Sequence, residues 1–153
     1  MNARDWFSLI RDKAEKLAKL EDDAATKRAA VLPKGQQYEP SSHGGASDGS
    51  AAMLSYIQAD SELDTMRAEV EQLLERASEV LYGRSGRGGL AMRKDTASAD
   101  CVFGYYLLCM TWREVADELV RPESRDGKLW CRMRARRAFD YMDRVGMESL
   151  IDS

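Results

Sequence analysis

The residues with the clearest capacity for chemistry are five cations near the carboxyl end of this 153-residue chain. They fall within ten positions that hold no acidic residue: Lys128, Arg132, Arg134, Arg136 and Arg137. Such side chains donate hydrogen bonds to phosphate oxygens and to guanine edges in the major groove of DNA. Because the whole chain is acidic, with a net charge of −3, this density favours a DNA contact over the alternative, a solvated basic face.

A helix has to position these cations, and the sequence predicts one over Leu129–Val145 with a stop at Gly146. On a helical projection, one stripe is apolar and has Phe139 at its edge: Cys131, Ala135, Ala138 and Met142. The helix therefore has an apolar back and a basic front, a form that fits the major groove. The candidate DNA-binding residues are Lys128, Arg132, Met133, Arg134, Arg136 and Arg137, of which all but Arg134 project clearly away from the stripe.

Two preceding helices are predicted to pack on that apolar back. Residues 101–110 are apolar nearly all round, which indicates a buried helix, and three residues before it are candidate N-caps: Asp95, Thr96 and Ser98. Thr111 and Glu114 form a capping-box pattern at the start of a helix over 112–119. Its inner stripe is predicted to hold Trp112, Val115, Ala116 and Leu119. We expect Trp112 to be structural and not a reader of bases, packed against the 103–107 segment and the third helix. Pro122 and Asp126–Gly127 indicate a turn.

Little in the sequence supports an enzyme or a metal site. The three cysteines, Cys101, Cys109 and Cys131, show no Cys-x-x-Cys spacing, and the single histidine, His43, lies in a Gly/Ser-rich segment. A zinc site or a catalytic pair would have to assemble from these scattered positions. We therefore expect a non-enzymatic protein with reduced thiols, no cofactor and no metal. With neither a signal peptide nor a membrane span in the pattern, we expect it in the cytoplasm.

The first half of the chain predicts two long helices. The first is amphipathic and runs from about Asp5 to Leu32, and Pro33–Ser50 reads as a loop that composition predicts to be disordered. The second spans Ala52–Tyr82 and carries a heptad seam, of which the oligomerisation candidates are Leu63, Met66, Val70 and Leu73. This seam can pair with the first helix within the chain or with a second chain. Its acidic faces predict no contact with nucleic acid.

Gly83–Gly89 ends the second helix, and it is interpreted as a flexible linker in preference to an Arg-Gly nucleic-acid contact. The predicted organisation is thus a helical hairpin or coiled coil over 1–82, a linker over 83–89 and a DNA-binding domain over 90–153.

Two motifs follow one another in a known order. The first is the stretch from Tyr106 to Leu119, which contains Thr-Trp-x-Glu-Val-Ala-x-Glu-Leu, and the second is the basic helix that ends with Arg137-Ala138-Phe139-Asp140-Tyr141-Met142. This order resembles the sigma-factor region 4-like helix-turn-helix of small phage transcriptional regulators of the RinA/ArpU type. The loop from Pro33 to Asp48 before an acidic helix is also similar. Two features depart from the family: Leu108-Cys109 stand where it has a polar residue and glycine, and the Leu119–Cys131 connection is longer.

The resemblance implies an all-α fold in which 111–119 supports a recognition helix over 129–142. It also implies a phage or prophage regulator that binds double-stranded DNA and controls late or packaging genes in a bacterial host cell. The expected partners are DNA, a second copy of the chain in a homodimer or higher oligomer, and host RNA polymerase. The alternative is a phage structural or assembly protein, such as a small packaging subunit or scaffold, that acts through helical oligomerisation.

Overall fold

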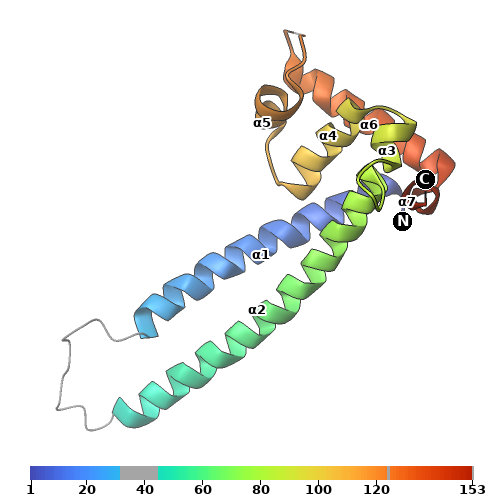
Figure 1. Ribbon diagram of the computed structural model, residues 1–153. Coiled ribbons are helices and arrows are strands. Elements are labelled where there is room, and N and C mark those ends of the chain that lie inside the picture. The colour runs from blue at the N-terminus through green and yellow to red at the C-terminus, as the bar shows by residue number, and fades with distance from the viewer. Residues whose placement is uncertain (32–44, 124, 153) are drawn as a thin grey trace. The chain divides into compact units, whose positions relative to one another are not determined.

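The computed structural model describes residues 1–31, 45–123 and 125–152, and this part of the chain contains helices and turns but no strand (Figure 1). The predicted all-α fold class is confirmed. In chain order the helices are α1 (Ala3–Val31), α2 (Gly45–Tyr82), α3 (Gly89–Arg93), α4 (Thr96–Val102), the π-helical turn η1 (Phe103–Leu107), α5 (Trp112–Glu114), the π-helical turn η2 (Val115–Val120), α6 (Gly127–Val145) and α7 (Met147–Ile151). His43 and residues 32–44 of the predicted loop lie outside the described residues, whereas 45–50 already belong to α2.

The described residues form two compact units. The core unit comprises Met1–Glu15 and Val70–Ser153, and the hairpin unit comprises Lys16–Glu69. This division differs from the predicted boundary after residue 82. The physical reason is that the first turns of α1 and the last turns of α2 bury apolar side chains, including Phe7, Ile10, Val80 and Leu81, in the same core as the carboxyl-terminal helices.

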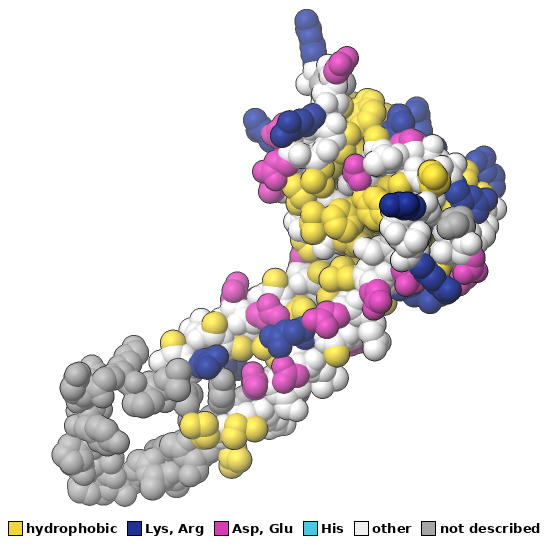
Figure 2. Space-filling model, viewed as in Figure 1, with side chains coloured by type: hydrophobic (Ala, Val, Ile, Leu, Met, Phe, Trp, Pro, Cys, Tyr) yellow, Lys and Arg dark blue, Asp and Glu magenta, His cyan; other side chains and the backbone are white. Residues whose placement is uncertain are grey.

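Within the hairpin unit, residues 16–31 of α1 and 45–69 of α2 run antiparallel side by side (Figure 1). Leu63 is buried and Met66 half-buried on the predicted seam. Arg67 Nε lies 3.2 Å from Glu21 Oε1, which joins the two helices. The hairpin within one chain is therefore present, and pairing of the seam between chains stays a prediction. Figure 2 shows charges of both signs along this unit and apolar side chains near the start of α2, where Met53, Leu54 and Ile57 are exposed.

The predicted linker is instead a tight turn of the core unit. The amides of Gly83, Gly86 and Gly88 donate to the carbonyls of Glu79, Gly83 and Tyr82 at 2.7, 3.2 and 2.7 Å. Gly83 and Gly89 have φ values of 78° and 65°, and a Cβ on Gly89 would lie 2.6 Å from the backbone nitrogen of Gly83. Glycine is therefore needed for backbone conformation and for close approach, and not for flexibility. The remaining seam residues belong to this unit: Val70 is buried, and Leu73 packs against the core.

The helices before α6 begin where polar side chains cap them. Asp95 Oδ1 accepts the backbone N–H of Ser98 at 2.7 Å at the start of α4, and the predicted Thr111–Glu114 capping box is present at α5. The predicted helix over 101–110 is wrong at its end, because η1 closes at Leu107 and Leu108 is half-exposed. Leu119 is also 39% exposed, contrary to the predicted inner stripe. The wide turn of η2, in which Arg121 N–H donates to the Ala116 carbonyl, changes the helical spacing there.

Candidate nucleic-acid interface

Helix α6 presents one apolar and one basic side, as the sequence predicts. Asp126 Oδ1 accepts the Leu129 N–H at 3.0 Å and starts the helix two residues earlier than expected, and Gly146 ends it. The buried side packs against α4, α5 and η2 through the predicted stripe of Cys131, Ala135, Ala138 and Met142 and through the flanking Phe139. Five of the six candidate residues are exposed: Lys128, Arg132, Met133, Arg136 and Arg137.

Along one flank of α6 runs a groove of about 630 Å³ that lies wholly within the core unit. Four of the predicted residues line it: Lys128, Arg132, Met133 and Arg136. The remaining lining residues are Arg4 of α1, Tyr105 and Tyr106 of η1, Trp112 of α5, and Leu129, Ala135 and Phe139 of α6. Four cations and no carboxylate thus line the groove, so its charged side chains favour an anionic ligand.

Three aromatic residues, which we call the aromatic wall, form the side of the groove opposite α6: Tyr105, Tyr106 and Trp112. The rings of Tyr105 and Trp112 stack with centroids 4.0 Å apart and an interplanar angle of 6°. Tyr106 is buried and meets Trp112 edge to face at 6.2 Å. Trp112 therefore packs on the 103–107 segment as expected. It is nevertheless only half-buried and its ring lines the groove, so it is not enclosed in the core as a purely structural residue would be.

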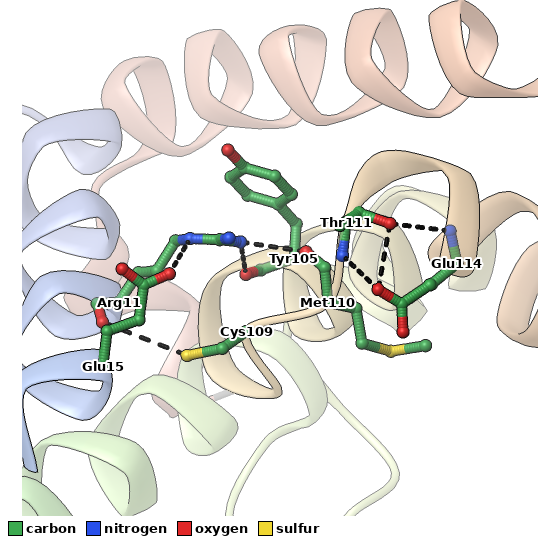
Figure 3. A network of polar contacts seen from close by, with 7 residues as sticks. All are labelled: Arg11, Glu15, Tyr105, Cys109, Met110, Thr111 and Glu114. Atoms are coloured by element: carbon green, nitrogen blue, oxygen red, sulfur yellow. Dashed lines mark hydrogen bonds and ion pairs between the residues drawn. The ribbon is translucent and has the colours of Figure 1, made fainter. Parts of the chain in front are cut away.

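Arg11 holds the aromatic wall from the α1 side (Figure 3). Its guanidinium lies 3.8 Å from the centroid of the Tyr105 ring. The same group donates to the carbonyls of Tyr105 and Met110, the latter at 3.0 Å, and pairs with Glu15 at 2.9 Å. These contacts satisfy one carbonyl of η1 and one carbonyl just before α5, and they fix the segment between the two helices.

Between these carbonyls, Cys109 takes a left-handed backbone conformation with φ of 56°. Non-glycine residues adopt this conformation only rarely. The turn at Cys109 therefore has the backbone form that glycine favours. Thr111 then caps α5, with its amide donating to Glu114 Oε1 at 3.2 Å (Figure 3).

Arg134, the sixth candidate, lies apart from the groove. Its Nη2 is 3.3 Å from Asp95 Oδ1, and its guanidinium is 5.0 Å from the centre of the Trp130 ring. Burial acts to raise the pKa of the Asp95 carboxyl, but hydrogen bonds from Ser98 and the charge of Arg134 outweigh it and lower that pKa below its ordinary value. Arg134 therefore joins α6 to the start of α4.

The structure adds residues to the interface that sequence reasoning did not place there. Arg4 comes from the first turn of α1, and the backbone N–H of the adjacent Ala3 donates to Asp143 Oδ1 of α6 at 2.8 Å. Because Arg4 lies more than a hundred positions from α6, no local sequence pattern could predict that it lines the same groove. Tyr105 could have been suspected, because an aromatic residue beside a basic helix is a common element of nucleic-acid sites.

The cysteines belong to the core more than to the interface. Cys101 and Cys131 are buried, and burial raises the pKa of both thiols and that of the half-buried Cys109. Within the described residues no cluster of three or more His, Cys, Asp or Glu side chains is arranged to hold a metal ion.

Comparison of the chain with models of protein families, with curated proteins and with solved structures finds no match. Among the described residues, no helix combines the length and the apolar character needed to cross a membrane.

Proposed function

We propose that this protein binds double-stranded DNA through the exposed basic side of α6. One observation carries the proposal: Arg4, Lys128, Arg132 and Arg136 line one groove without a carboxylate among the lining residues. Arg137 extends the basic side beyond the groove. Lys128, Arg132 and Arg136 follow one another at intervals of four residues, about 6 Å along the helix axis. A row of this kind can meet successive phosphates, or place arginines at guanine edges in the major groove.

The regulatory role rests on this DNA contact and on the resemblance to the RinA/ArpU-type regulators. The capping box at Thr111 and the left-handed Cys109 support the resemblance at the positions where its pattern is read. The proposed role is a phage or prophage transcriptional regulator of late or packaging genes, acting in the cytoplasm of a bacterial host cell. A second copy of the chain and host RNA polymerase are its proposed protein partners.

A structural or assembly protein is the second candidate, and the hairpin unit favours it. Met53, Leu54 and Ile57 expose 45, 67 and 55% of their surface close to the start of α2. Exposed apolar side chains grouped in this way are typical of interaction surfaces. Sedimentation velocity separates the two roles, because a dimer supports the regulator and a ring of many copies supports the assembly protein.

The proposal is tested by measuring duplex affinity as a function of salt. Three or four phosphate contacts predict that log K falls with log salt at a slope of about −3 per protomer. The Arg132→Glu/Arg136→Glu variant should lose binding, because it removes two contacts and adds two repulsive charges, while its thermal melt stays that of the wild type.

The matched control reverses two exposed arginines of the glycine turn, Arg84→Glu/Arg87→Glu, and makes the same change in net charge. We expect it to lower affinity by less than about threefold, since general charge acts only through a screened field. Binding by a folded Arg132→Glu/Arg136→Glu variant at wild-type affinity contradicts the proposal.

A further inference from the structure

Trp112 has one ring face that no other ring covers. Tyr105 stacks on the first face, and Arg11 lies on the far side of Tyr105, so the order is guanidinium, phenol, indole. Tyr106 meets the indole only edge to face. Among the described residues no ring stacks on the second face, although the side chain is half-exposed and lines the groove. A planar aromatic ligand could extend the stack by one layer.

The opposite side of the groove supplies charge and apolar surface together. Lys128, Arg132 and Arg136 provide the cations, and the half-exposed side chains of Leu129 and Met133 lie among them. The groove volume of about 630 Å³ falls within the range of small-ligand sites, roughly 300–1,000 Å³. An aromatic ring that carries phosphate matches both sides of the groove.

We propose that the groove binds an unpaired nucleotide of a single DNA strand, with its base stacked in the aromatic wall at Trp112 and its backbone along the cations of α6. Three cations in a row exceed what one phosphate needs, so a strand fits better than a free nucleotide. A paired base is enclosed in its duplex and has no face free to stack. The inference goes beyond duplex binding, because duplex contact requires the cations but not the aromatic wall.

The site is already organised before a ligand arrives. The Arg11 contacts to the Tyr105 and Met110 carbonyls hold the segment that carries the stack, and the Thr111–Glu114 capping box fixes the first turn of α5. A stacking surface that is fixed in advance loses little conformational entropy on binding.

The experiment titrates the full chain with fluorescently labelled octathymidylate and follows its anisotropy, and repeats the titration with unlabelled octathymidylate to follow tryptophan emission. Base stacking on Trp112 predicts saturable binding and quenching of that emission. Trp112→Leu should bind octathymidylate about 5- to 150-fold more weakly, the loss typical of one base–aromatic stack. Trp112→Phe should restore affinity to within about threefold while losing most of the quenching. Trp130→Phe, which alters a tryptophan outside the groove, should keep both the affinity for octathymidylate and the quenching of tryptophan emission.

A thermal melt establishes whether each variant is folded. If Trp112→Leu is unfolded, the proposal is tested by comparing the tryptophan quenching of Trp112→Phe with that of Trp130→Phe. Quenching that persists in Trp112→Phe overturns the proposal, as does wild-type affinity in folded Trp112→Leu. If thymidine monophosphate binds as tightly as octathymidylate, the ligand is not a strand. If a paired duplex quenches the emission equally, the ligand need not be an unpaired base. Duplex binding is measured separately as a function of salt. Loss of duplex binding would contradict the proposed function, whereas loss of stacking on Trp112 would contradict only this site.

Discussion

The two flanks of α6 carry the same kinds of side chain in opposite surroundings. On the groove flank, Arg132 and Arg136 are exposed and line a groove without a carboxylate. On the other flank, Arg134 is two-thirds covered, pairs with Asp95 and lies over Trp130, and its Nε is buried without a hydrogen-bond partner. We call these the free flank and the paired flank.

The comparison shows that an arginine's neighbours, and not its place in a basic run, determine what it can do. A guanidinium that already meets a carboxylate and an aromatic ring has little to gain from a phosphate, because binding would first break those contacts. The arginines of the free flank give up only water and counterions, and counterion release favours binding. Arg134 therefore contributes to stability, whereas Arg132 and Arg136 are left available for a ligand.

The largest effect on stability is expected from reversing a charge on the paired flank. Arg134→Glu removes the partner of Asp95 and places a second carboxylate beside it. Loss of a hydrogen bond between charged groups costs about 1.5–3 kcal/mol, and because the Arg134 side chain is 33% exposed we expect about 2 kcal/mol. The matched reversal on the free flank, Arg136→Glu, should stay within about 0.5 kcal/mol of the wild type.

Urea unfolding followed by circular dichroism measures both variants. If both variants lose the same free energy of unfolding, the two flanks do not differ in their contribution to stability, and the structural role assigned to Arg134 is wrong.

A smaller and pH-dependent effect is expected at Asp95 itself. Asp95→Ala removes both the N-cap of α4 and the ion pair with Arg134 but adds no repulsive charge, so it should cost about 1–2 kcal/mol at neutral pH. Because the folded-state pKa of Asp95 is lowered, its ionised form stabilises the fold above the ordinary pKa, near 4, and this contribution disappears as pH falls through the lowered value. The difference between wild type and Asp95→Ala should therefore narrow below about pH 4 in urea titrations at successive pH values.

Asp95→Asn is the control, since the amide oxygen still caps α4 but carries no charge for Arg134. It should be more stable than Asp95→Ala at every pH. A gap between wild type and Asp95→Ala that widens in acid would contradict the lowered pKa.

Local patterns in the sequence were enough to predict much of this fold. The ends of α2 at Tyr82 and of α6 at Val145, the capping box at Thr111 and the buried stripe of α6 each depend on residues within one or two turns of each other. The short helix α7 was not predicted, because five residues carry too little periodicity.

What the sequence did not reveal depends on contacts between distant segments. Composition alone predicts a linker at the glycine turn, because it cannot show that Gly83 and Gly89 lie in close contact. The sequence groups Arg134 with its neighbours because its partner, Asp95, lies 39 positions away, at the N-cap of another helix. For the same reason the groove could be predicted only on its α6 side, without Arg4 or Tyr105.

The smallest effect is expected from Lys94, which follows α3 and contacts Tyr141 of α6 through a single weak interaction. Its Nζ is 5.7 Å from the centre of the Tyr141 ring, and the side chain is exposed. A cation–π contact between exposed groups contributes about 0.5–1 kcal/mol, and this distance is near the outer limit of about 6 Å. Lys94→Gln keeps most of the side-chain length, so urea unfolding should detect a loss below about 0.5 kcal/mol. A loss as large as that of Arg134→Glu would mean that rings, and not the Asp95 carboxylate, hold the paired flank together, and the distinction between the two flanks would then have to rest on Trp130 and Tyr141.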